Sequence, residues 1–143
     1  MDVVATHGNP PGHAGVFWGL HVEPADDALT QESCLAVIIE PRSTSPLNGL
    51  VRLYSITMGD QPLRRIRATH QMAETAIELD WNAPVGISLR IDAGKPAALE
   101  IQGRDVELPQ PKSVLDWAVF RNGRCGIVSR RQRVVFTRAF LLQ

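Results

Sequence analysis

The dipeptide Asn122-Gly123, which stands between two apolar runs, constrains the fold more than any other stretch. Asn-Gly supplies the two positive-φ positions of a type I′ turn, which joins two antiparallel strands tightly. We therefore predict a β-hairpin over 117–128. A two-residue turn fixes the register, so Arg121 should face Arg124 and Phe120 should face Cys125. The buried face of this hairpin is predicted to hold Ala118, Phe120, Cys125 and Ile127.

Short apolar or alternating runs recur along the rest of the chain at the spacing typical of strands. The predicted strands cover 15–22, 34–40, 50–58, 63–70, 76–81, 87–91, 97–101, 106–108 and 134–142. The unbroken apolar run 34–40 predicts a strand buried on both faces. The turn residues 59–62 predict a second hairpin between 50–58 and 63–70. The alternation of 76–81 and 87–91 predicts a third hairpin, in which Asp80 or Glu78 faces Arg90.

These runs predict an all-β chain of about nine or ten strands with no substantial helix, built as an antiparallel β-sandwich or a small β-barrel. A chain of 143 residues suits one domain. Residues 1–14 contain a dense cluster of Pro, Gly and Asn and are predicted to be a flexible N-terminal loop, followed by a single β domain over 15–143.

The apolar runs are too short to span a membrane, and the N-terminus lacks the pattern of a secretory signal. The sequence as it stands therefore predicts a cytoplasmic protein, or a periplasmic or secreted one if an export signal has been removed. Of the two cysteines, Cys34 and Cys125, we expect a pair of buried free thiols, with a disulfide between them as the alternative.

Charge is distributed unevenly although the formal net charge is zero. Residues 1–41 contain acids and no Lys or Arg, whereas residues 117–143 contain arginines and no acid. Either the two ends of the chain pair in the fold, or the arginines form a face that binds an anion or an acidic partner. The candidates for that face are Arg121, Arg124, Arg130, Arg131 and Arg133. Zero net charge argues against nucleic acid as a partner.

Motifs that carry catalysis are missing from the sequence. It has no nucleophile elbow, no His or Cys pair at metal-ligand spacing and no glycine-rich phosphate loop, so no catalytic residue, metal or cofactor is predicted. Aromatic and imidazole side chains on predicted strands are candidates for lining a cavity: Trp18, Trp81, Trp117 and His70.

Two function classes follow from this pattern. The favoured hypothesis is a noncatalytic sandwich or barrel that acts as a binding or assembly module, with a protein partner or a second copy of itself. The alternative is a small β-barrel enzyme or carrier that holds a small apolar molecule in its interior.

Residues 86–96, Gly-Ile-Ser-Leu-Arg-Ile-Asp-Ala-Gly-Lys-Pro, resemble a strand and turn of the invasion-associated locus B family of exported bacterial β proteins. The order of Trp18 on an early strand and Cys34 at the start of the next is also similar. The chain departs from the family in lacking its paired cysteines soon after the Ile91-Asp92 turn. The resemblance implies a noncatalytic binding role in the periplasm or outside the cell.

Overall fold

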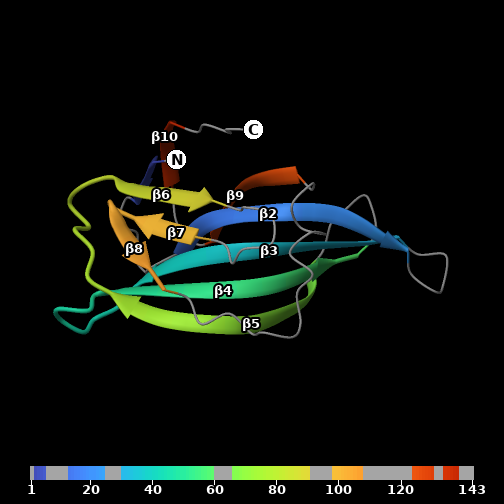
Figure 1. The fold of residues 1–143 in the computed structure, drawn as a ribbon, viewed down its shortest axis with the longest axis horizontal. Helices are drawn as coiled ribbons and strands as arrows, with labels where there is room; N and C mark the ends of the chain where they lie inside the picture. Colours follow the sequence, from blue (N-terminus) through green and yellow to red (C-terminus); the bar gives the residue numbers. More distant parts are fainter. Residues whose placement is uncertain are drawn as a thin grey trace.

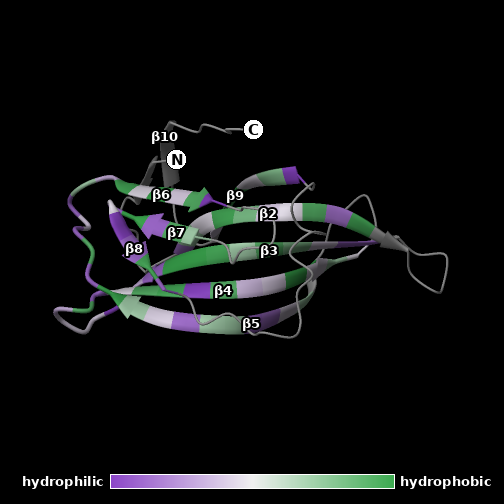
Figure 2. Cartoon of the chain, in the orientation of Figure 1, coloured by the Kyte–Doolittle hydropathy of each residue, from purple (hydrophilic) through white to green (hydrophobic). Residues whose placement is uncertain are grey.

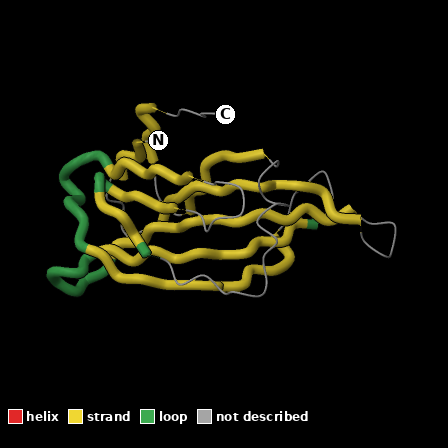
Figure 3. The backbone as a smooth tube through the Cα atoms, viewed as in Figure 1, coloured by secondary structure: helices red, strands yellow, loops and turns green. Residues whose placement is uncertain are grey.

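A computed structural model describes residues 2–5, 13–24, 30–59, 66–90, 98–107, 124–130 and 134–138 of the chain. These residues form ten strands and contain no helix (Figure 3). In chain order the strands are β1 (Asp2–Ala5), β2 (His13–Pro24), β3 (Thr30–Pro41), β4 (Gly49–Met58), β5 (Ile66–Ile77), β6 (Val85–Arg90), β7 (Ala98–Ile101), β8 (Arg104–Val106), β9 (Arg124–Arg130) and β10 (Val134–Arg138). In this part of the chain no helix is long and apolar enough to cross a membrane.

Two antiparallel sheets, each of five strands, are formed by these elements. The long sheet has the order β5-β4-β3-β2-β9, and the short sheet has the order β10-β1-β6-β7-β8. Strands β6, β7 and β8 lie over one end of the long sheet (Figure 1). The all-β prediction is confirmed, and because the described strands stay in two separate sheets, the architecture is a sandwich and not a closed barrel.

Strand β3 is the central strand of the long sheet, and its apolar run explains that position. Every residue from Cys34 to Ile39 is buried, as the sequence predicts, and the middle of β3 is green in Figure 2. A strand buried on both faces needs apolar residues at every position. Successive side chains of β3 therefore enter two different apolar clusters, one on each face of the long sheet.

The inner face of the long sheet packs against the short sheet and forms the main core. From the long sheet it contributes Ala14, Val16, Trp18, Leu35, Val37, Ile39, Val51, Leu53 and Ala73. The short sheet and the segment that leads into it contribute Leu79, Val85, Ile87, Leu99 and Ile101. This shared cluster is the physical link between the two layers.

The outer face of the long sheet is also apolar at its centre. It carries the buried side chains Leu20, Cys34, Ala36, Ile38 and Ile56, with Phe17, Tyr54, Met58 and Val128 packed against them. Phe17 leans over Gly126 of the edge strand, where a Cβ atom would lie 2.7 Å from its ring. An aromatic ring over a strand glycine covers backbone that has no side chain of its own.

The two ends of the chain are neighbours in both sheets. Strand β1 pairs with β10, and β2 pairs with β9, so the acidic N-terminal third lies beside the arginine-rich C-terminal segment. This arrangement corrects the prediction of a loop over 1–14, because Asp2–Ala5 forms β1 and β2 begins at His13. The proline and glycine cluster at 8–12 lies outside the described residues.

The predicted hairpin over 117–128 is described only in its second strand. Strand β9 is present, but 117–123, including the Asn-Gly turn, lies outside the described residues. The predicted burial of Cys125 and Ile127 is wrong, because both are exposed while Gly126 and Val128 are half-buried. The reason is the pairing with β2, which sets Gly126 opposite Phe17 and turns Gly126 and Val128 toward the outer-face cluster.

The predicted hairpin of 76–81 with 87–91 is also wrong. Strand β5 continues to Ile77 and pairs with β4, as predicted for 50–58 and the strand that follows it. Residues 78–84 then cross from the long sheet to the short sheet. Arg90 stands opposite Ala98, while Glu78 forms an ion pair with Arg104 at 3.8 Å. The crossover segment, residues 78–84, alternates in hydropathy because buried Leu79 and half-buried Trp81 pack against the core. Its backbone turns at Trp81 and Asn82.

Candidate functional site

Two side-chain amides hold the crossover segment to the two sheets. Asn48, just before β4, accepts a hydrogen bond from Leu79 N at 2.8 Å and donates one to Leu79 O at 2.9 Å. Gln102, in the turn between β7 and β8, accepts from Asp80 N at 3.0 Å and donates to Asp80 O at 2.8 Å. Each amide takes the place of a neighbouring strand, which explains how the backbone groups of Leu79 and Asp80 are satisfied without a β-ladder.

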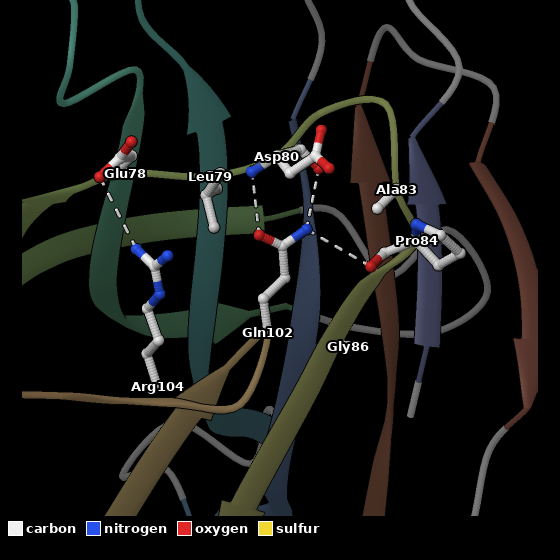
Figure 4. A pocket seen from close by; sticks show the side chains of 8 residues that line it. All are labelled: Glu78, Leu79, Asp80, Ala83, Pro84, Gly86, Gln102 and Arg104. Carbon is white, nitrogen blue, oxygen red and sulfur yellow. Dashed lines mark hydrogen bonds and ion pairs between the residues drawn. The ribbon is translucent and has the colours of Figure 1, made fainter.

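A depression of about 700 Å³, open to solvent, lies beside this crossover. Figure 4 shows Gln102 reaching across it to the backbone of Asp80 and Pro84, with Glu78 and Arg104 paired at one side. Its lining residues are Glu78, Leu79, Asp80, Ala83, Pro84, Gly86, Gln102 and Arg104. The Gln102 amide is bonded to backbone groups and the Glu78–Arg104 pair is exposed. We therefore interpret the depression as part of a structural joint, the set of contacts that fastens the crossover segment to the two sheets.

The Asn48 clamp should matter for stability. An Asn48→Ala variant is expected to lose about 2 kcal/mol of unfolding free energy, because it removes two hydrogen bonds and leaves the backbone of buried Leu79 without partners. Urea unfolding measures the loss. Asn82→Ala, at an exposed position nearby, is the control and should change the free energy by less than about 0.5 kcal/mol. Equal effects of the two changes would contradict the role of the clamp.

At Trp18 and Leu35, which still belong to the main core, the inner face of the long sheet begins to change from apolar to polar. The Trp18 row consists of four residues that stand opposite one another on β2 to β5: Trp18, Leu35, Ser55 and His70. The next inner-face row, the His21 row, consists of His21, Ser33, Thr57 and Ala68. In Figure 1 the labelled strands β6, β7 and β8 lie over the end of the long sheet where β2 begins. These two rows form the candidate site.

A β-bulge in β2 brings His21 to the same face as Trp18. The register with β3 shifts between Trp18 and His21, and Gly19 within the bulge has φ +70°. Regular alternation would send residues three apart to opposite faces. The extra residue instead turns Leu20 to the outer face and His21 to the inner face. His21 Nδ1 donates to Gly19 O at 2.7 Å, which fastens the imidazole to the bulge.

A second bulge, in β5, does the same for His70. The register with β4 shifts between Leu53 and Tyr54, so Ala73 and His70 both stand opposite inner-face residues although they are three positions apart. Bulges often occur next to functional sites, where they change the direction of a side chain. The two bulges place His21 on β2 and His70 on β5, so each row carries one imidazole on the inner face.

Trp18 carries the most unusual polar group of the candidate site. Its side chain is buried, with the residue 4% exposed, and its Nε1 has no hydrogen-bond partner among the described residues. An indole N–H can only donate. A buried donor without an acceptor costs about 1–3 kcal/mol, so the position calls for an acceptor. Nearby in the ladders lie three hydroxyl side chains, those of Ser33, Ser55 and Thr57, of which Ser33 is 6% exposed.

The structure brings together some of the predicted cavity residues and separates others. Trp18 and His70 face the same side of the long sheet in the Trp18 row, buried Trp18 on β2 and exposed His70 on β5, with β3 and β4 between them. Trp81 lies at the other end of the inner face, where its Nε1 donates to Asn48 O at 3.3 Å, so it belongs to the structural joint. Trp117 lies outside the described residues.

The predicted arginine face is described at two positions only. Arg124 is exposed at the start of β9, opposite Leu20, and Arg130 ends the same strand opposite His13. Arg121, Arg131 and Arg133 lie outside the described residues. The arginine face therefore stays a prediction.

An ion-pair network that the sequence analysis missed crosses the outer face. Arg52 Nη1 bonds Glu40 at 2.6 Å, and Arg52 Nε bonds Glu74 at 2.8 Å. His13 lies 3.5 Å from Glu40. The hydrogen bond with Glu74 raises the pKa of Arg52, and that same bond lowers the pKa of Glu74. The network joins β2, β3, β4 and β5 and is explained as a structural tie between strands.

The two cysteines are free thiols in different surroundings. Cys34 is buried on the outer face, as predicted, whereas the predicted burial of Cys125 is wrong because it is exposed on β9. Burial raises the pKa of the Cys34 thiol to about 11, and the charge of Glu32 adds to the effect. The two thiols should therefore react very differently.

Iodoacetamide at pH 8 is expected to modify Cys125 and leave Cys34 intact, because the thiolate is the nucleophile and Cys34 is both buried and held protonated. Mass spectrometry of the native protein should show one adduct per chain, and of the urea-unfolded protein two. A Cys125→Ser variant should show none until it is unfolded. Comparable labelling of both cysteines in the native protein would contradict the placement of Cys34.

No group of three or more His, Cys, Asp or Glu side chains that could hold a metal ion occurs in the described part of the chain. Comparison of the sequence and the structure with protein-family models, with curated proteins and with solved structures found no match. The resemblance of residues 86–96 to the invasion-associated locus B family therefore stays an expectation.

Proposed function

We propose that this protein is a noncatalytic β-sandwich binding module, and that it binds a small molecule at the Trp18 and His21 rows. The observation that carries the proposal is the buried Trp18 Nε1 without a partner among the described residues. It lies next to inner-face positions that carry hydroxyl and imidazole groups in place of apolar core residues. A few polar groups at the edge of an apolar wall are typical of small-molecule sites.

The two bulges support this choice of site over the crossover depression. Gly19 with φ +70° and the shifted register of β5 each depart from regular sheet geometry, and both turn an imidazole to the inner face. At the crossover depression, by contrast, the amide of Gln102 is already bonded to backbone atoms.

A fluorescent probe tests the proposal without knowledge of the natural ligand. Anilinonaphthalene sulfonate, which brightens on apolar surfaces, is expected to bind the wild-type protein. Ser55→Phe, which places a ring on the half-buried inner-face position in the Trp18 row, should weaken that binding at least tenfold. Ile66→Ser, which removes an exposed apolar side chain from the outer-face side of the same sheet, is the matched control and should leave it unchanged.

The control distinguishes probe binding at the inner face from nonspecific binding to exposed apolar side chains. Probe binding that survives Ser55→Phe and falls with Ile66→Ser would move the site to the outer face and overturn the proposal. Absence of probe binding to the wild-type protein would also overturn it. Circular dichroism on each variant checks that the sheets remain folded.

A further inference from the structure

The chemistry around Trp18 limits which molecules suit the site, and this step rests on the proposed binding function. Trp18 Nε1 offers a hydrogen and accepts none. Its row partner Leu35 is 0% exposed and apolar, Val16 and Val37 pack in the same cluster, and the hydroxyl and imidazole side chains of the two rows lie on the other side. The Trp18 and His21 rows contain no carboxylate. The surroundings of Trp18 are therefore apolar on one side and carry hydroxyl and imidazole groups on the other.

We infer that the ligand is an amphiphile, with an apolar body and a polar end that carries a hydrogen-bond-accepting oxygen, such as a carbonyl, carboxylate or sulfonate group. The oxygen accepts from Trp18 Nε1, and the rest of the polar end lies along Ser33, Ser55 and Thr57, whose hydroxyls donate or accept as needed. A purely apolar ligand would leave the indole N–H without a partner, so the site should discriminate against ligands that lack an acceptor.

Two probes with the same ring system separate the acceptor from the apolar body. Anilinonaphthalene sulfonate carries an acceptor, and N-phenyl-1-naphthylamine is the same aromatic body without the sulfonate. The wild-type protein is expected to bind the sulfonate probe at least tenfold more tightly than the neutral one. Trp18→Phe keeps a ring and removes the N–H, so it should weaken the sulfonate probe about tenfold and change the neutral probe less than twofold.

Trp81→Phe is the matched control, because Trp81 donates to Asn48 O at the far end of the inner face; it should change neither affinity. Equal wild-type affinities for the two probes, or a Trp18→Phe effect of the same size on both, would overturn the acceptor while leaving binding at the inner face intact. If Ser55→Phe blocks neither probe, the binding site itself is wrong, and the inference fails with it. The wild-type comparison decides the question even if Trp18→Phe does not fold.

Discussion

Gly15→Ala is expected to destabilise the protein by about 3 kcal/mol or more. A Cβ atom at this position would lie 1.8 Å from the Val37 carbonyl oxygen and 2.8 Å from its carbon, so it would strike the backbone of β3. No side-chain rotation relieves that contact. Strands β2 and β3 would have to separate at the centre of the long sheet, where both clusters are buried. Urea unfolding with a constant slope measures the loss.

Two other glycines provide matched controls for Gly15. At Gly126 a Cβ meets only the ring of Phe17, which can rotate, and at Gly103 it meets no atom within 4 Å but the backbone has φ +73°. Alanine should cost about 1 kcal/mol at each. A Gly15→Ala variant as stable as Gly103→Ala would show that β2 and β3 do not approach so closely.

Leu53→Ala should have the second large effect, a loss of about 3 kcal/mol. Leu53 is 2% exposed and lies on the inner face between Val37 and Ala73, where the short sheet closes over the long one. The smaller side chain removes buried apolar surface and leaves a cavity between the layers. Because domains of this size are stable by about 5–15 kcal/mol, the change should lower the urea midpoint clearly.

The control for Leu53 is Leu47→Ala, at a position in the loop before β4 that is 45% exposed. Its free energy of unfolding should change by less than about 0.5 kcal/mol. Similar losses for the two variants would contradict the two-layer core that both sheets share.

The all-β class and the central strand could be predicted because their signals are local. The unbroken apolar run of β3 specifies a strand buried on both faces, and the turn after Met58 specifies the β4–β5 pairing. The crossover after Ile77 could not be predicted from alternation alone. Apolar and polar residues alternate along 78–81 whether a paired strand or the side chains of Asn48 and Gln102 satisfy the backbone, and those two residues are distant in sequence.

Two members of the candidate site could be found from the sequence. Trp18 and His70 stand out as an aromatic and an imidazole on predicted strands, and they share a row. The sequence does not group four further residues with them, His21, Ser33, Ser55 and Thr57. Strict alternation places His21 on the face opposite Trp18, and only the register of β2, β3 and β4 places the three hydroxyls beside it. The glycine at position 19, inside a strand pattern, was the available signal of a bulge. No comparable signal marks the bulge in β5.

The central claim is that the buried indole of Trp18 belongs to a ligand site, and the indole resonances of ¹⁵N-labelled protein test it most directly. The three tryptophans give three indole signals, and the Trp18 signal is the one missing from the Trp18→Phe spectrum. On titration with anilinonaphthalene sulfonate, the Trp18 indole resonance should shift strongly downfield as its N–H gains an acceptor, while the Trp81 resonance stays in place. A Trp18 resonance that does not move while the probe is bound would contradict the account.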